Sequence, residues 1–190
     1  MSDPPSAVTI RPYEERDRRA VQELFVRINR ELAPEHLRGQ FEDYIRRSLA
    51  KEIDVIADYY GARDGGFWVA NDGRAGALIG MFGLERVDAD TAELRRMYVA
   101  PQARRRGIAR MMLAHAEEVC GDRGYRRLVL STSELQQAAL ALYRAADFRF
   151  VREETAAGQT NKTVGAGLRR FHFEKELDRP PRDVPFCRPM

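Results

Sequence analysis

The sequence predicts a mixed α/β protein with a mostly antiparallel central sheet of about seven strands, flanked by about four helices. Two kinds of pattern support this fold class: short apolar runs bounded by Gly, Pro or Asp, and longer stretches whose apolar residues recur at helical spacing. The runs follow the order strand, two helices, three strands, helix, strand, helix, two strands. One helix between two neighbouring strands is the usual crossover of a parallel pair, so the sheet should be mixed.

The first half of the chain predicts one strand, two helices and a meander. The strand begins near Val8 and is closed by Pro12, and the first helix runs from Asp17, which could cap it, to about Leu32. A second helical region continues to about Lys51, and the segment "YYGARDGG" is typical of a turn. Three strand-like runs separated by turn residues follow: "FWVAND", "AGALIGMFGLERVD" and "TAELRRMYV".

The second half contains the crossover. After Pro101 the period becomes helical, and Gly121 ends that helix before the strand "RRLVLSTS". Ser133 and Gln136 have the spacing of a capping box for the next helix, whose apolar stripe includes Tyr143. The last two strands are "FRFVREE" and "LRRFHFEKEL", and the polar loop over residues 155–167 between them is long enough to suggest a function. We expect one domain over residues 1–178 and a proline-rich tail over 179–190.

Composition excludes several classes of protein. The 32 basic and 29 acidic residues nearly cancel, so global charge favours nucleic acid only weakly. Cys120 and Cys187 are too few for a disulfide framework, and no Cys/His cluster indicates a metal site. The N-terminus lacks the pattern of a signal peptide, and no apolar run is long enough to span a membrane. These observations favour a cytoplasmic protein with reduced thiols, no metal and no membrane partner.

Arginines gather where the crossover helix begins. The stretch "RRMYVAPQARRRGIARMML" places six of them between Arg95 and Arg110, against a chain net charge of +3. A helix N-terminus offers free N–H groups and partial positive charge, Gly107 permits close backbone approach, and guanidinium groups bind phosphate bidentately. Together these features predict a pyrophosphate site. Neither GxxxxGK[ST] nor GxGxxG accounts for it, since Gly165–Gly167 is the only GxG in the chain.

Two motifs in this region resemble those of the GNAT superfamily of N-acetyltransferases. "MYVAPQARRRGIARMML" is similar to the family's acyl-CoA-binding pattern, Arg/Gln-x-x-Gly-x-Gly/Ala after a strand, with Arg104, Gly107 and Ala109 at its fixed positions. "AALALYRAADF" is similar to the second motif, a helix ending in Leu-Tyr before a Gly-Phe turn. Two residues depart from the family: Asp147 replaces the turn glycine, and Gln136 stands where many relatives have Asn. The order of strands and helices also resembles that of the family from Val8 to Leu177.

The resemblance implies direct acetyl transfer from acetyl-CoA to an amine in a ternary complex. Tyr143, which periodicity alone would place in the core, would protonate the leaving thiolate. Glu93, with Glu85 or water as the alternative, would remove the amine proton, and backbone N–H groups of residues 97–99 would hold the oxyanion. The residues that the resemblance implies in coenzyme binding are Met97, Tyr98, Val99, Arg104, Arg105, Arg106, Gly107, Ile108, Ala109, Arg110 and Gln136.

The identity of the acceptor amine is the least constrained part of this interpretation. The resemblance places it between the segment Leu32–Tyr60 and the 155–167 loop, where aromatic residues occur: Phe41, Tyr44, Tyr59 and Tyr60. A small amine, an amino acid or a peptide N-terminus would each suit these walls, and a homodimer would be compatible with them. Two other functions stay open: a non-catalytic acyl-CoA-binding regulatory domain, and a nucleic-acid-binding protein. The last is disfavoured because only Tyr98 lies near the arginines to stack on a base.

Overall fold

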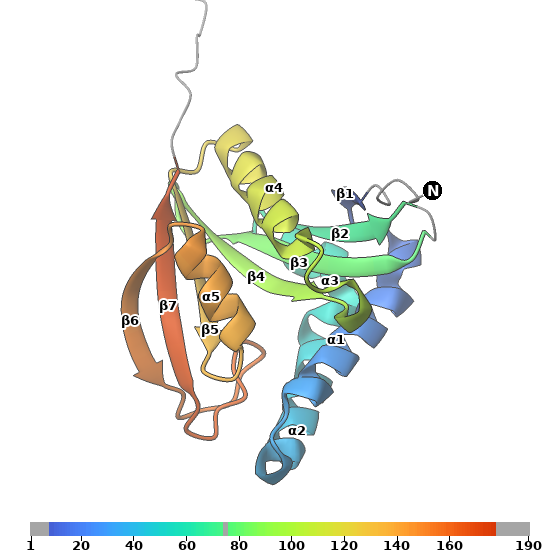
Figure 1. The fold of residues 1–190 in the computed structure, drawn as a ribbon, viewed down its shortest axis with the longest axis vertical. Helices are drawn as coiled ribbons and strands as arrows, with labels where there is room; N and C mark the ends of the chain where they lie inside the picture. The colour runs from blue at the N-terminus through green and yellow to red at the C-terminus, as the bar shows by residue number, and fades with distance from the viewer. Residues whose placement is uncertain (1–7, 74–75, 178–190) are drawn as a thin grey trace, which may run out of the picture.

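The computed structural model describes residues 8–73 and 76–177 and confirms a mixed α/β fold (Figure 1). Its single sheet has the strand order β1-β2-β3-β4-β5-β7-β6. The strands are β1 (Val8–Pro12), β2 (Gly66–Asp72), β3 (Leu78–Arg86), β4 (Thr91–Val99), β5 (Arg127–Ser133), β6 (Arg149–Thr155) and β7 (Arg169–Glu176). The helices are α1 (Arg18–Leu32), α2 (Arg38–Lys51), the short α3 (Ile56–Gly61), α4 (Ile108–Asp122) and α5 (Gln137–Ala145).

The pairing of β4 with β5 is parallel, and every other pair in the sheet is antiparallel. Helix α4 is the crossover between those two strands, as the sequence predicts. After β5 and α5 the chain forms the hairpin of β6 and β7, and β7 inserts between β5 and β6. This insertion brings the segment that joins β6 to β7 to the same end of the sheet as the beginning of α5 (Figure 1).

Helices cover both faces of the sheet, and two glycines of β3 allow them to approach closely. A Cβ on Gly80 would lie 2.8 Å from Met112 Sδ of α4, and one on Gly83 would collide with the Tyr60 ring of α3. Positions 80 and 83 are an odd number apart on the strand and so lie on opposite faces. Helix α4 therefore packs on one face, as Figure 1 shows across β3 and β4, and α3 packs on the other.

Three local predictions differ from the structure. Asp17 does not cap α1, because its carboxylate binds the Arg11 guanidinium and the Glu14 backbone N–H instead. The segment predicted as a turn includes α3, whose Tyr59 and Tyr60 are buried. Helix α5 begins only at residue 137, so the predicted capping box is incomplete: the Ser133 backbone N–H donates to Gln136 Oε1 at 3.3 Å, but no side chain caps the helix.

The proline-rich tail predicted for residues 179–190 lies outside the described residues, and the single domain over residues 1–178 stays a prediction. Within residues 8–73 and 76–177, no helix combines the length and the apolar character needed to cross a membrane.

A β-bulge interrupts β4 at Arg96. Tyr98 pairs with Met81 and Arg95 with Gly83, so one extra residue of β4 lies opposite Phe82. The extra residue is Arg96, whose φ of 54° is in the left-handed region that side chains other than glycine rarely adopt. Such a conformation costs on the order of 1–2 kcal/mol, so its neighbours must hold it in place.

The bulge is held by a buried carboxylate. Glu52, directly after α2, is 0% exposed and receives Arg95 Nη2 at 2.9 Å and Arg96 Nε at 2.9 Å. Consecutive residues of a regular strand point to opposite faces, and the bulge is what lets both arginines reach one carboxylate. The Tyr60 hydroxyl (2.8 Å) and Asn161 Nδ2 (3.1 Å) complete the contacts of Glu52. The cluster thus ties α2, α3, β4 and the β6–β7 loop together.

Replacing Glu52 with Gln should destabilise the protein strongly. Burial opposes ionisation of Glu52, but Arg96 and Arg95 outweigh it and lower its pKa below 4.5. Loss of the charge would leave the buried Arg96 guanidinium without its carboxylate and Arg95 with Glu85 alone, an effect of about 3–5 kcal/mol at neutral pH. Because the folded-state pKa is depressed, this contribution is present above pH 4.5 and is lost as the pH falls below it.

Urea unfolding of wild type and Glu52→Gln over a pH series measures this effect. The matched control is Glu23→Gln, because Glu23 is exposed and, among the described residues, its ion pair is with Arg19 one turn away; its change should stay within about 0.5 kcal/mol. Equal unfolding free energies for wild type and Glu52→Gln at neutral pH would show that the cluster does not stabilise the fold.

Candidate active site

The site is an opening between two parallel strands. β4 pairs with β5 only from Thr91 to Leu94, opposite Arg127 to Leu130. Beyond Leu94 the bulge turns β4 away, and the two strands separate, as Figure 1 shows. Tyr98 and Val99 keep their pairing with Met81 and Gly80 of β3 on one edge, whereas on the other edge no strand of the described chain pairs with residues 97–99. Backbone groups in such a gap are free to bind a ligand.

Tyr143 of α5 lies at this opening. Its side chain is buried between Phe148 and Phe173, with ring centroids at 5.8 and 6.2 Å. Its hydroxyl lies 4.0 Å from Met97 Sδ, just after the bulge. Burial raises the pKa of Tyr143 above its usual value of 10, so the phenol keeps its proton at neutral pH. The structure thus brings a protonated hydroxyl to the strand edge where the sequence predicts an oxyanion site.

Residues 104–107, which we call the arginine turn, lie between β4 and α4. Arg105 and Gly107 both have positive φ (62° and 78°), and Gly107 is the N-cap of α4 without a side-chain cap, so the first N–H groups of the helix are unsatisfied. Ile108 is buried and anchors the turn, while residues 104–107 and Arg110 are exposed. A Cβ on Gly107 would meet nothing within 4 Å, so the space in front of the helix N-terminus is open.

The six arginines do not act as one cluster. Arg95 and Arg96 are buried in the Glu52 cluster and contribute nothing to the turn. Of the others, Arg104 pairs with Glu31 of α1 at 3.1 Å and Arg106 with Asp72 of β2 at 3.1 Å. These exposed pairs are weak and readily exchanged for a stronger anion. Arg105 and Arg110 form no ion pair with any described residue.

Both candidate bases are bound by one lysine. Glu85 and Glu93 face each other across β3 and β4, and Lys162 Nζ lies 2.5 Å from Glu85 Oε1 and 2.6 Å from Glu93 Oε2. Burial works against ionisation of Glu85, but Arg95 and Lys162 outweigh it and lower its pKa to about 2. Glu85 is therefore a fixed counter-ion and a poor base. Glu93 is more exposed, at 19% of its side chain against 7%.

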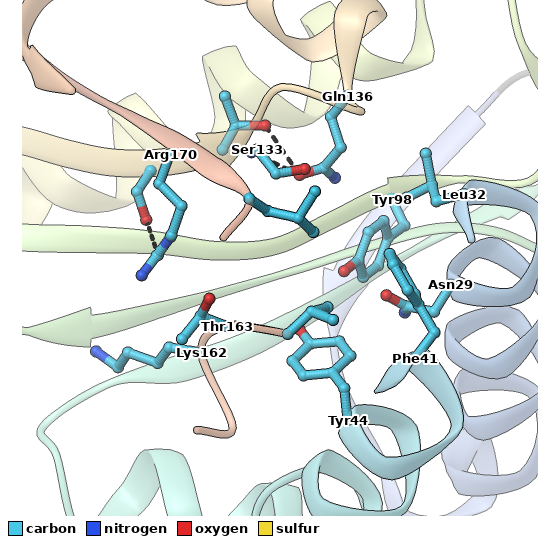
Figure 2. Close-up of a pocket in the computed structure, with 14 residues that line it drawn as sticks. Asn29, Leu32, Phe41, Tyr44, Tyr98, Ser133, Gln136, Lys162, Thr163 and Arg170 are labelled. Atoms are coloured by element: carbon cyan, nitrogen blue, oxygen red, sulfur yellow. Dashed lines mark hydrogen bonds between the residues drawn. The ribbon is translucent and has the colours of Figure 1, made fainter. Parts of the chain in front are cut away.

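A cavity of about 70 Å³ extends from the strand opening beneath the β6–β7 loop (Figure 2). Its walls come from α1, α2, β4, β5, β7 and the loop. They are formed by Asn29, Leu32, Phe41, Tyr44, Tyr98, Ser131, Thr132, Ser133, Gln136, Lys162, Thr163, Val164, Leu168 and Arg170. One water needs roughly 10–15 Å³, so the cavity has room for a few waters or for the polar end of a small ligand.

Several predicted residues meet at this cavity and others do not. Phe41 and Tyr44 line it, as expected for an acceptor wall. Tyr59 and Tyr60 were predicted beside them, but their hydroxyls bind Arg95 and Glu52 of the buried cluster instead. Gln136 lines the cavity with its Oε1 accepting from Thr132 Oγ1 at 2.9 Å. Its predicted contact with the coenzyme stays a prediction.

The residues that sequence reasoning missed are Asn29, Lys162, Arg170 and the serines at the end of β5. Lys162 and Arg170 lie in a polar loop and in an alternating strand, where a cation normally faces solvent. Only the insertion of β7 between β5 and β6 brings them to the cavity. No local pattern could have identified them. Across residues 8–73 and 76–177, no group of three or more His, Cys, Asp or Glu residues is placed to hold a metal ion.

Comparison with known proteins agrees with this geometry. Residues 20–148 match the model of the acetyltransferase (GNAT) family, which includes β4, the arginine turn, α4 and Tyr143. The chain belongs to the acetyltransferase (GNAT) family. It is 29% identical over 136 residues to human N-acetyltransferase 8, which covers 68% of this chain and 56% of that protein. The chain thus spans little more than half the length of the N-acetyltransferases whose sequences it resembles.

Solved structures share the fold at low sequence identity. A GNAT-family acetyltransferase from Staphylococcus aureus superposes with a TM-score of 0.72 at 19% identity, covering 90% of this chain and 100% of that one. An acetyltransferase from Salmonella typhimurium, solved with its cofactor acetyl-CoA, gives 0.69 at 18% identity and covers 92% and 96%. Such identities establish the common fold alone.

Proposed function

We propose that the protein transfers an acetyl group from acetyl-CoA to a primary amine of a small molecule, an amino acid or a peptide, directly and within a ternary complex. The observation that carries the proposal is the opening between β4 and β5, where the Tyr143 hydroxyl meets the bulged strand at Met97. Family membership supports it, since the family is one of acetyltransferases.

Acetyl-CoA would bind along the opening, with its pyrophosphate at the arginine turn. The first N–H groups of α4 and the guanidinium groups of Arg104, Arg105, Arg106 and Arg110 supply donors and positive charge there. The open space before Gly107 fits an incoming phosphate, because nothing stands within 4 Å of a Cβ at that position. Acetyl-CoA supplies the activated acetyl thioester. Residues 97–99 then offer backbone N–H groups to the oxyanion that forms on the acetyl carbonyl.

Two side chains would move protons. A protonated alkyl amine has a pKa near 10 and must lose a proton before it can attack. We assign that step to Glu93 through water, because Arg95 and Lys162 lower the pKa of Glu85 to about 2 and make Glu85 a poor proton acceptor. Tyr143, which burial keeps protonated at neutral pH, would donate its hydroxyl proton to the departing thiolate.

Replacing Gly107 with Val should weaken acetyl-CoA binding by about tenfold or more, which corresponds to about 1.4 kcal/mol. A β-branched side chain strains a residue with φ of 78° and fills the space before the helix N-terminus. The control is Gly124→Val at the other end of α4, where φ is 84°: it adds similar strain away from the turn. Calorimetry with acetyl-CoA measures both variants. Unchanged affinity in Gly107→Val would refute the placement of the pyrophosphate.

Replacing Tyr143 with Phe should lower the rate of acetyl transfer by roughly 10²-fold, the usual scale for a positioned acid. The ring contacts with Phe148 and Phe173 remain, so stability and acetyl-CoA affinity should barely change. Thiol release from acetyl-CoA across a panel of amines identifies an acceptor, and single-turnover transfer to it then compares the variants. Tyr13→Phe, a half-buried tyrosine packed on Phe67 away from the opening, is the control.

Equal single-turnover rates in wild type and Tyr143→Phe would make this tyrosine a packing residue. If acetyl-CoA binds but no amine in the panel releases thiol, the chain is instead a non-catalytic acyl-CoA-binding domain.

Replacing Glu93 with Gln should lower turnover most at low pH, where the acceptor amine is protonated and needs the base. Acetyl-CoA affinity should not change. Because Gln would also weaken the contact to Lys162, Lys162→Met is the second variant: it breaks the same ion pair and keeps the carboxylate. Glu117→Gln, which breaks the pair with Lys175 elsewhere, is the control. The pH–rate profile is the measurement, and an unchanged profile in Glu93→Gln would remove Glu93 from the mechanism.

A further inference from the structure

We infer that the acceptor carries a carboxylate beside its amine, and that Arg170 binds this carboxylate. The inference rests on the proposed function and narrows its acceptor to free α-amino acids and closely similar amines. Arg170 enters the cavity from β7, and Figure 2 shows its guanidinium reaching the cavity from the side opposite α1 and α2.

The Arg170 guanidinium is largely buried but has few partners. Its side chain is 16% exposed, and within residues 8–73 and 76–177 it donates one hydrogen bond, to the Ser131 hydroxyl of β5 (Figure 2). The nearest carboxylate oxygen, Glu154 Oε1, lies 3.7 Å from Nη1, which is beyond hydrogen-bond distance. An arginine has five N–H donors, and desolvating them without acceptors is unfavourable. The geometry leaves donors for a ligand.

The charged groups around the cavity also favour an anionic ligand at Arg170. Glu154 is shared, because it also binds Arg152 and lies 3.0 Å from His172 Nε2. The other cation at the cavity, Lys162, is already neutralised by Glu85 and Glu93. No Asp or Glu is among the residues that line this cavity within the described chain. Arg170 is therefore the cation there whose charge is least compensated, and the cavity favours an anionic group.

A carboxylate fits better than other anions. The planar guanidinium fork matches a carboxylate bidentately, and a cavity of about 70 Å³ suits a group of that size. The opposite wall is apolar and aromatic, with Leu32, Phe41 and Tyr44. The acceptor would thus present an amine toward Tyr98 and the strand opening, a carboxylate to Arg170 and an apolar side chain to α1 and α2. The first residue of a peptide lacks this carboxylate, because its carboxyl group forms the peptide bond.

Matched acceptors test the inference. Phenylalanine and leucine are each compared with the corresponding amide, the decarboxylated amine, the aminophosphonate and a dipeptide, by kcat/KM for thiol release. Wild type should favour the free amino acids by about 10-fold to 100-fold, the range for a hydrogen-bonded charged group. Arg170→Gln should lose this preference and leave the amides and decarboxylated amines within about threefold of wild type. Arg170→Lys keeps the positive charge but lacks the planar guanidinium fork, so its preference for free amino acids should lie between those of wild type and Arg170→Gln.

Arg152→Gln is the matched control, because Arg152 lies exposed on β6, contacts the same Glu154 and does not line the cavity. A binding measurement separates this inference from the proposed reaction: calorimetric titration of phenylalanine and phenylalaninamide into the protein saturated with CoA. Arg170-dependent binding of the free acid would support the inference even if no amine were acetylated. Equal binding and turnover of acid, amide and amine would overturn the inference. A higher kcat/KM for the aminophosphonates than for the free amino acids would also overturn it, as would an equal fall in kcat/KM for all acceptors in Arg170→Gln.

Discussion

The left-handed bulge at Arg96 is the constraint on which the rest of the site depends. One extra residue turns β4 away from β5 after Leu94, and the opening between two parallel strands exists because of it. The strained conformation persists because Glu52 receives both Arg95 and Arg96 in a fully buried cluster. Removing charge from that cluster would relax the strand and the site together, so stability and site geometry share one interaction.

The proposed coenzyme site and the cavity are formed by elements on different faces of the sheet. Helices α4 and α5 contribute the arginine turn and the Tyr143 hydroxyl, while α1, α2 and the β6–β7 loop enclose the cavity. The loop also reaches the buried cluster, since the Asn161 amide donates to Glu52 and Lys162 joins Glu85 to Glu93. A ligand that displaces Lys162 would therefore act on the same charges that hold the bulge.

The sequence alone predicts those features that depend on local pattern. The strand β4 follows from a strand-like run bounded by turn residues, and Gly107 with its arginines follows from the physics of a helix N-terminus. The sequence alone does not predict which distant segments come into contact. Asn161 lies 109 positions from Glu52, and nothing near either residue indicates that they meet. The same limit explains why Tyr59 and Tyr60 were predicted at the acceptor wall, and why Arg170 was missed.

Amide hydrogen exchange with and without acetyl-CoA tests the central claim most directly. That claim is that one ligand binds both the strand edge freed by the bulge and the N-terminus of α4. We expect acetyl-CoA to slow exchange at two separate places, the N–H groups of residues 97–99 and those of residues 107–110, while β1 and β2 are unchanged. Protection at only one of these places, or protection spread evenly over the sheet, would contradict the claim.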